Sequence, residues 1–182
     1  MLILLSPAKS LQMGRALASD TRTEPRMAAQ TKALIKVLKR KSAGEIKQLM
    51  SLSDKLAELN HQRYQGWEQA QSAQAIVAFD GDVYSGLDAE SLDADALDYA
   101  QAHLRMLSGL YGLLRPFDSM KPYRLEMGTK LANPHGEDLY DFWGDQLAEQ
   151  INTDAKAAGA SHIVNLASNE YFKAANAKAL AL

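Results

Sequence analysis

Two glycines that bracket two large apolar residues constrain the fold of this chain more than any other short stretch. Gly109 and Gly112 enclose Leu110 and Tyr111, and the group follows a segment in which apolar residues recur at helical spacing. Because glycine lacks a side chain, such a turn can bring backbone N–H groups close to an anion. The pattern is typical of a helix-hairpin-helix, placed here at about residues 95–116, which binds nucleic-acid phosphates without base contacts. The alternative interpretation is an ordinary helix that ends at a C-terminal glycine.

Two arginines flank this glycine turn. Arg105 precedes Gly109 by one helical turn and Arg115 follows Gly112 by three residues, so both could lie beside a bound phosphate. Pro116 limits the second helix, because proline removes a backbone donor and clashes with the preceding turn. We therefore expect a second helix of a single turn, or one that restarts at Pro116.

Charge is segregated along the chain, although the net charge is only −2. Residues 1–55 carry eleven Lys and Arg against four Asp and Glu, and residues 105–135 carry five against two. Residues 56–104 carry one basic residue against nine acidic ones. If the two basic blocks meet in the fold, they would present a positively charged face to a nucleic acid.

The composition fits one globular domain in the cytoplasm. With 182 residues, of which 47% are hydrophobic and 23% charged, the chain can bury a single core. The absence of cysteine excludes disulfides, thiolate metal sites and cysteine nucleophiles. The apolar start at residues 1–5 is too short to span a bilayer and lacks the basic segment of a signal peptide. We expect a cytoplasmic protein with no membrane partner.

The alternation of apolar runs predicts a mixed α/β (α+β) fold in which short strands alternate with several helices. Strands are expected at residues 2–5, 75–79 and 162–167. Helices are expected from Pro25 onward, at 46–50, from Ser53 to Gly66, along the apolar stripe Leu97, Ala100, Leu104 and Leu107, at 137–151 and from Ser168 onward.

Polar residues follow the first and the last predicted strand. Ser6 and Lys9 come after the first, and Ser168, Asn169 and Glu170 after the last. In open sheets ligands gather beyond the carboxyl ends of strands, so the two loops could flank one ligand crevice. There Lys9 would supply a cation and Ser168 a donor. Alternatively, Ser168 only caps a helix and Lys9 is solvated.

No local pattern indicates a metal or a cofactor. The four histidines stand at no metal-binding spacing, and neither a P-loop nor a dinucleotide glycine motif occurs. An iron site assembled from distant histidines and carboxylates has no local signal in its favour. We expect no cofactor and no metal ligands.

Seven ordered blocks nevertheless give the chain a specific resemblance to a known family. They include the start MLILLSPAK, the motif FDGDVYSGL at residues 79–87 and the glycine-turn block QAHLRMLSGLYGLLRP at 101–116. The others are residues 53–57, 122–128, 138–144 and 165–173. On these blocks the chain resembles the YaaA-type peroxide-stress proteins. Their longer C-terminal segment, rich in strands, is expected to be missing here, which makes this chain a shortened member.

The resemblance implies a protein that protects cells against hydrogen peroxide by limiting free intracellular iron, and with it oxidative DNA damage. It also implies binding to double-stranded DNA, largely independent of sequence, through the helix-hairpin-helix and a basic cleft. Iron would be at most an indirect ligand, and a non-enzymatic role is favoured over an enzymatic one. The expected DNA-binding residues are Lys9, Lys55, Arg105, Gly109, Leu110, Tyr111, Gly112, Arg115, Lys121 and Arg124.

A second hypothesis remains open beside DNA binding. The strand-end crevice could belong to an enzyme that processes a small molecule or a nucleotide, with no catalytic residue assigned. Its candidate residues are Ser6, Lys9, Ser168, Asn169 and Glu170.

Overall fold

A four-stranded sheet organises the chain, with strands in the order β6-β5-β1-β8. The computed structural model describes residues 1–181. The strands are β1 (Leu2–Leu5), β5 (Leu104–Ser108), β6 (Gly112–Leu114) and β8 (Ile163–Asn165). β1 runs parallel to β5 and β8, whereas β5 and β6 are antiparallel. The mixed α/β class is therefore confirmed, and the carboxyl ends of three parallel strands share one edge.

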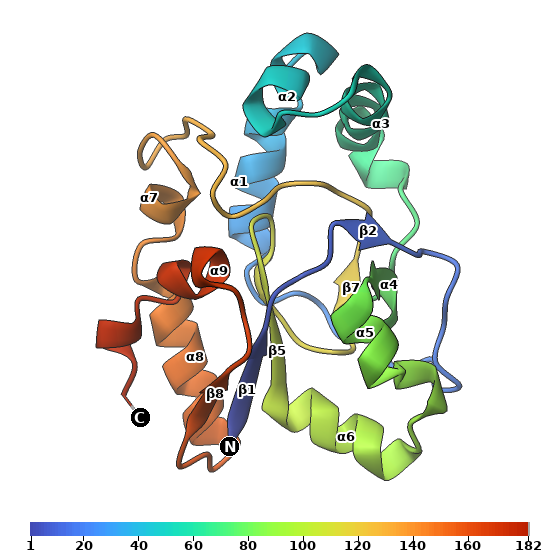
Figure 1. Ribbon diagram of the computed structural model, residues 1–182, viewed down its shortest axis with the longest axis vertical. Helices are drawn as coiled ribbons and strands as arrows, with labels where there is room; N and C mark the ends of the chain where they lie inside the picture. Colours follow the sequence, from blue (N-terminus) through green and yellow to red (C-terminus); the bar gives the residue numbers. More distant parts are fainter. Residues whose placement is uncertain (182) are drawn as a thin grey trace.

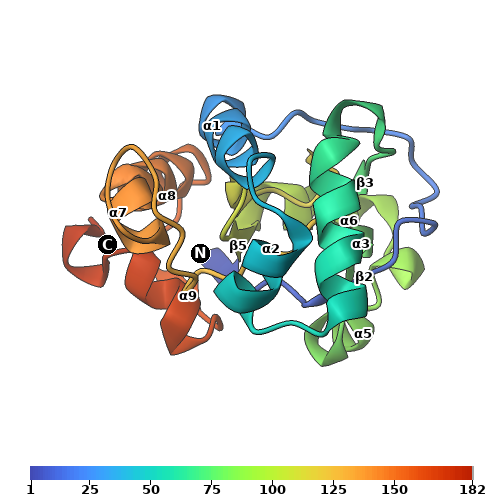
Figure 2. The same ribbon diagram turned by 90° about the horizontal axis from the view of Figure 1, so that it is seen from above.

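Helices cover this sheet on both sides (Figures 1 and 2). On the side of β8 lie α7 (Leu139–Trp143), α8 (Gln146–Ala157) and α9 (Asn169–Ala174). On the other side lie α4 (Ala75–Ala78), α5 (Asp82–Leu87) and α6 (Ala94–His103). The helices α1 (Ala28–Leu38), α2 (Ala43–Met50) and α3 (Asp54–Gln65) gather at the upper end of Figure 1.

Short elements complete the described part of the chain. Two small antiparallel sheets pair β2 (Ser10–Leu11) with β4 (Phe79–Asp80), and β3 (Ala73–Gln74) with β7 (Ser119–Met120). Three 3₁₀ turns are η1 (Trp67–Gln69), η2 (Ala89–Ser91) and η3 (Ala177–Ala179).

Capping side chains fix where two helices begin: α3 begins as the sequence predicts, whereas α2 begins at Ala43, three residues before the predicted start, and includes Gly44. Ser53 accepts a hydrogen bond from the backbone N–H of Leu56 at the start of α3, which ends at Gly66 as expected. Ser42 and Glu45 form a reciprocal capping box at the start of α2. In both cases a side-chain oxygen satisfies a backbone donor that the first helical turn leaves without a partner.

The single helix predicted at 137–151 is wrong, because Gly144 divides the segment. Gly144 has φ 48° and ends α7, and α8 begins two residues later. The left-handed conformation lets glycine end a helix without steric cost. Apolar residues spaced four apart still bury one face across the break: Leu139, Trp143, Leu147 and Ile151 are all inaccessible to solvent.

The strand predicted at residues 75–79 is also wrong. The segment forms the one-turn helix α4 and only its last residue, Phe79, belongs to a strand. All five residues are buried. A short apolar run that is buried on all sides carries no periodicity, so its hydrophobicity alone cannot separate a strand from a helical turn.

The helix-hairpin-helix predicted at about 95–116 is the main correction. α6 ends at His103, and residues 104–114 form the β-hairpin β5–β6. Its loop holds three residues, Gly109 to Tyr111, and Gly112 follows with φ 72°. A three-residue loop followed by a left-handed glycine is a common hairpin connection. The two glycines therefore reverse a strand instead of joining two helices.

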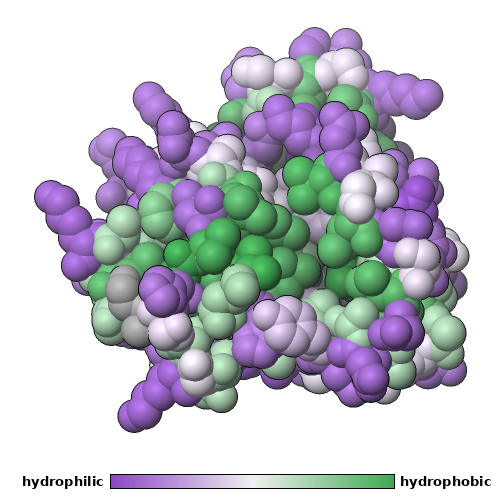
Figure 3. Space-filling view, turned by 60° about the horizontal axis from the view of Figure 1, so that its bottom comes forward, coloured by the Kyte–Doolittle hydropathy of each residue, from purple (hydrophilic) through white to green (hydrophobic). Residues whose placement is uncertain are grey.

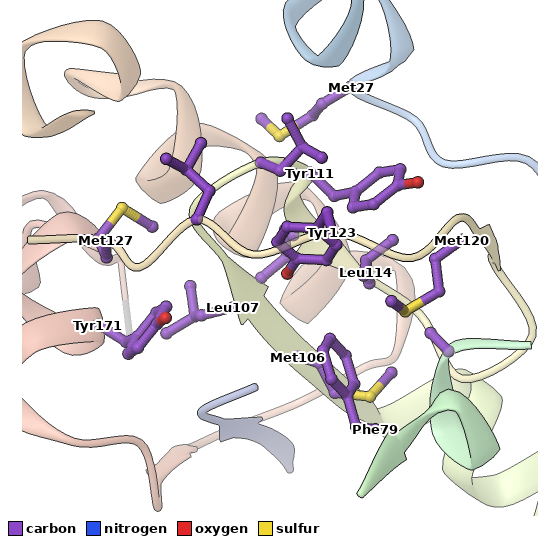
Figure 4. Close-up of a cluster of buried hydrophobic side chains, with 14 of the residues drawn as sticks. Met27, Phe79, Met106, Leu107, Tyr111, Leu114, Met120, Tyr123, Met127 and Tyr171 are labelled. Atoms are coloured by element: carbon purple, nitrogen blue, oxygen red, sulfur yellow. The ribbon is translucent and has the colours of Figure 1, made fainter. Parts of the chain in front are cut away.

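The hairpin lies in the core, where its side chains contact those of distant segments. Figure 4 shows Met106, Leu107, Tyr111 and Leu114 from this hairpin among other buried side chains. The rings of Tyr111 and Tyr123 meet edge to face with centroids 5.4 Å apart. Figure 3 shows the surface of the molecule with the bottom of Figure 1 turned toward the reader. On this face an apolar area lies among hydrophilic side chains.

Candidate functional site

A crevice opens at the edge of the sheet where β1 and β8 end. Its volume is about 230 Å³. Three stretches far apart in the sequence line it: residues 6–9 after β1, residues 123–126, and three residues at the start of α9, Ser168, Glu170 and Tyr171. The structure thus brings Ser6, Lys9, Ser168 and Glu170 together, whereas Asn169 does not line this crevice.

Hydrogen bonds between distant segments hold the walls of the crevice. The Ser168 N–H donates to Ser6 Oγ at 2.8 Å, and the Leu166 N–H donates to the Leu4 carbonyl at 2.9 Å. On the opposite wall the Gly128 N–H donates to Glu170 Oε1 at 2.8 Å. These bonds fix the two strand-end loops in register with β1, so the crevice is shaped before any ligand arrives.

Tyrosines form the floor of the crevice and connect it to the core. Tyr123 and Tyr171 line the crevice, and the Tyr123 hydroxyl bonds Ser108 Oγ at 2.6 Å. Tyr84 donates to the Ser6 carbonyl at 2.7 Å. Burial raises the pKa of Tyr84, Tyr123 and Tyr171 above the ordinary tyrosine value. These phenols therefore remain neutral hydrogen-bonding groups at physiological pH.

Two cations share one carboxylate at the crevice. Glu126 Oε2 lies 3.3 Å from Lys9 Nζ, and Glu126 Oε1 accepts a hydrogen bond of 2.9 Å from the Arg124 guanidinium. The Lys9 side chain is 67% exposed, whereas that of Arg124 is 19% exposed. Arg124 Nε is buried and has no hydrogen-bond partner among residues 1–181. The crevice therefore pairs an exposed ammonium with a half-buried guanidinium whose donors are not all used.

Arg105 lies outside the crevice, in a buried ion-pair cluster. Its guanidinium, with that of Arg26, binds the carboxylate of Asp154 on α8. Arg105 is 5% exposed and Asp154 2% exposed. Burial alone would raise the pKa of Asp154, but hydrogen bonds and charge from the two arginines outweigh burial and lower it.

The residues of the glycine turn face the protein interior. Leu110 and Tyr111 are buried, and the Gly109 carbonyl accepts a hydrogen bond from the Trp143 indole N–H at 3.1 Å. A Cβ at Gly109 would overlap the carbonyl oxygen of Leu125. The backbone of this turn thus already contacts protein on the side where the helix-hairpin-helix hypothesis places a phosphate.

The remaining basic residues of the DNA-binding prediction lie apart from the crevice. Arg115 binds Asp118 at 2.8 Å, and Lys55 is exposed in the first turn of α3. The Lys121 ammonium donates to the carbonyls of Trp67 and Glu68 at 2.7 and 3.1 Å. Tyr111 and Lys121 line a separate groove of about 370 Å³ between α1, η1 and β7.

Sequence reasoning did not place Tyr123 and Glu126 at the crevice. The polar run at 123–126 is visible in the sequence, but no periodicity connects it to β1 or β8.

Among residues 1–181, no group of three or more His, Asp or Glu is arranged to hold a metal ion. In the same part of the chain, no helix is both long and apolar enough to cross a membrane.

The fold is that of an α/β protein with a crevice at the carboxyl ends of its parallel strands, and two cations (Lys9 and Arg124) and two carboxylates (Glu126 and Glu170) line this crevice. The chain belongs to the peroxide stress protein YaaA family, whose profile matches residues 1–182. It is similar to UPF0246 proteins of Bordetella pertussis, Bordetella parapertussis and Bordetella bronchiseptica. Each is 55% identical over 99% of this chain and 72% of the relative's own length. Family membership supports a role in peroxide stress.

Proposed function

We propose that the chain serves the peroxide-stress response by binding phosphate groups of duplex DNA at the strand-end crevice. The protection would limit oxidative DNA damage and the free iron that causes it. The observation that supports phosphate binding is the pairing of Lys9 with Arg124 at the mouth and wall of one crevice. This proposal replaces the glycine turn with the crevice as the centre of the DNA contact.

The chemistry of the two cations favours a phosphate ligand. A guanidinium offers several N–H donors in a plane that matches phosphate oxygens, and a lysine ammonium adds a mobile point charge. Phosphate contacts carry no sequence information, so binding would be largely independent of sequence. Lys55, exposed on α3, remains a candidate for additional backbone contacts.

Removing both crevice cations is expected to weaken DNA binding and to flatten its dependence on salt. For Lys9→Ala with Arg124→Ala, the slope of log affinity against log salt should fall by about 2, because each phosphate contact contributes about 0.9. Fluorescence anisotropy with an intact duplex at several salt concentrations measures the slope, and thermal unfolding verifies that the variant is folded.

The control for this prediction is Lys156→Ala, which removes an exposed lysine at the end of α8 that does not line the crevice. Its slope should stay close to that of the wild type, because no phosphate contact is removed. A wild-type slope in the folded double variant would contradict the assignment of DNA phosphates to the crevice.

A second candidate function is small-molecule or nucleotide chemistry in the same crevice. Its support is the combination of an ammonium, two carboxylates and a hydroxyl around about 230 Å³, with Lys9, Ser168 and Glu170 as candidate groups. A thermal-shift screen of metabolites and nucleotides tests it. Stabilisation by a metabolite that lacks phosphate, abolished in Lys9→Ala, would favour this candidate over DNA binding.

A further inference from the structure

The carboxylate of Glu126 occupies the position in the crevice where an external anion would be bound best. One of its oxygens contacts Arg124 and the other lies close to Lys9. A carboxylate between a guanidinium and an ammonium has the geometry of an anionic ligand held by two cations. Glu126 is 28% exposed, so its side chain can turn toward water and vacate this position.

Two residues that line the crevice, Arg124 and Ser168, have donors that Glu126 does not use. Arg124 Nε has no acceptor among residues 1–181 although it is buried, and a buried charged donor without a partner is costly. Ser168 precedes α9 without capping it through its side chain, so its hydroxyl can donate to a ligand. A ligand with more oxygen atoms than a carboxylate would therefore satisfy more donors than Glu126 does.

The charge and the free oxygens of a phosphate group determine how well it suits the crevice. The crevice has a volume of about 230 Å³ and is lined by residues of three chain segments. An internal phosphodiester has a sugar on both sides and carries one negative charge. A terminal phosphate monoester has one ester oxygen, three free oxygens and between 1.5 and 2 negative charges, roughly, at neutral pH. The monoester thus suits the two cations better in charge, and it offers more free oxygens as acceptors.

We propose that the crevice binds a phosphate monoester at a DNA strand end, in the position that the Glu126 carboxylate occupies in the free protein. This inference rests on the proposed function, since it names which DNA phosphate enters the crevice. Intact duplex would be held at the mouth of the crevice by Lys9 and by the exposed part of the Arg124 side chain. A strand break that ends in phosphate would in addition displace Glu126 and take its place on Arg124.

Nicked duplexes of one sequence test the inference by fluorescence anisotropy. The nick carries a 5′-phosphate, a 3′-phosphate or only hydroxyl groups, and an intact duplex is the reference. We expect at least one phosphorylated nick to bind about tenfold tighter than the hydroxyl nick, the effect of one or two additional charge-assisted hydrogen bonds. In Glu126→Gln this preference should increase, because the competing carboxylate is removed.

Glu149→Gln is the matched control, since it changes the net charge equally at an exposed position on α8. An equal increase in both variants would overturn the role of Glu126. Equal affinity for phosphorylated and hydroxyl nicks would overturn the inference, while salt-dependent binding of intact duplex would leave the proposed function standing. No binding to any duplex would contradict both. Adenosine monophosphate as a competitor distinguishes the sources: competition as strong as by the phosphorylated nick would overturn the strand-end assignment.

Discussion

Replacing Asp154 with asparagine is expected to lower the free energy of unfolding by about 3–5 kcal/mol, the cost of leaving a buried charge without its partner. The Asp154 carboxylate binds Arg26 and Arg105, and also accepts a hydrogen bond from Gln150 at 2.9 Å. The Arg26 side chain is 28% exposed and can turn to water, but that of Arg105 is only 6% exposed. The cost therefore arises mainly at Arg105.

Urea unfolding at neutral pH measures this effect, with Glu149→Gln as a control on the same helix. The loss at Glu149 should be below about 0.5 kcal/mol, as for most exposed substitutions. Replacing Asp154 and Arg105 together by apolar residues should recover much of the stability, because no unpaired charge then remains. If Asp154→Asn lowered the free energy of unfolding as little as Glu149→Gln does, the ion-pair cluster would not stabilise the fold.

The same cluster predicts the direction of an acid effect. The pKa of Asp154 is lowered in the folded protein. Unfolding restores the ordinary, higher pKa, so in acid the Asp154 carboxylate binds a proton when the protein unfolds. The stabilisation is complete above the unfolded-state pKa of about 4 and is lost as the pH falls through the lower folded-state value. Asp154→Asn should lack this part of the acid dependence.

Replacing Gly112 with alanine is expected to destabilise the fold by about 2–4 kcal/mol, through backbone strain and overpacking. Gly112 has φ 72°, and a Cβ there would lie 2.5 Å from Met27 Sδ and 2.7 Å from a ring carbon of Trp143. Neither neighbour can withdraw easily, because Met27 and Trp143 are buried in the core. Urea unfolding again provides the measurement.

Gly86→Ala is the matched control, since Gly86 lies in α5 and nothing stands within 4 Å of its Cβ position. This change should stabilise the protein by about 0.5–1 kcal/mol, because alanine favours a helix. The helix-hairpin-helix hypothesis predicts a different outcome for Gly112→Ala: normal stability with weakened DNA binding. That result would show that the turn contacts DNA instead of supporting the core.

Local signals in the sequence predict the elements whose boundaries depend on their own residues. The strand at 2–5, the Ser53 cap and the Gly66 end of α3 all appear as expected. In each case neighbouring residues satisfy the backbone or bury one face. The position of the strand-end loops also follows from a general property of parallel sheets.

Tertiary contacts decide the elements that the sequence misassigns. Leu104 and Leu107 continue the apolar stripe of α6, but both belong to the strand β5. Every residue of β5 is buried, because β5 lies between β1 and β6 and helices cover both sides of the sheet. A strand that is buried on both faces has no alternation to distinguish it from a helix. Tertiary contacts also decide the role of Arg105, which the sequence assigns to DNA binding. Its ion-pair partner Asp154 lies 49 residues away, so no local pattern could reveal the pair.

The crevice forms where residues from the two ends of the described chain come together. Ser6 and Ser168, which hydrogen-bond across it, are separated by 162 residues. Bringing such distant residues together costs chain entropy that only the completed core repays. A ligand of the crevice would thus bind the native state and not the unfolded chain, and it would raise the melting temperature of the whole protein. If the crevice binds DNA as proposed, the bound DNA would stabilise the native state of the protein under stress that unfolds proteins.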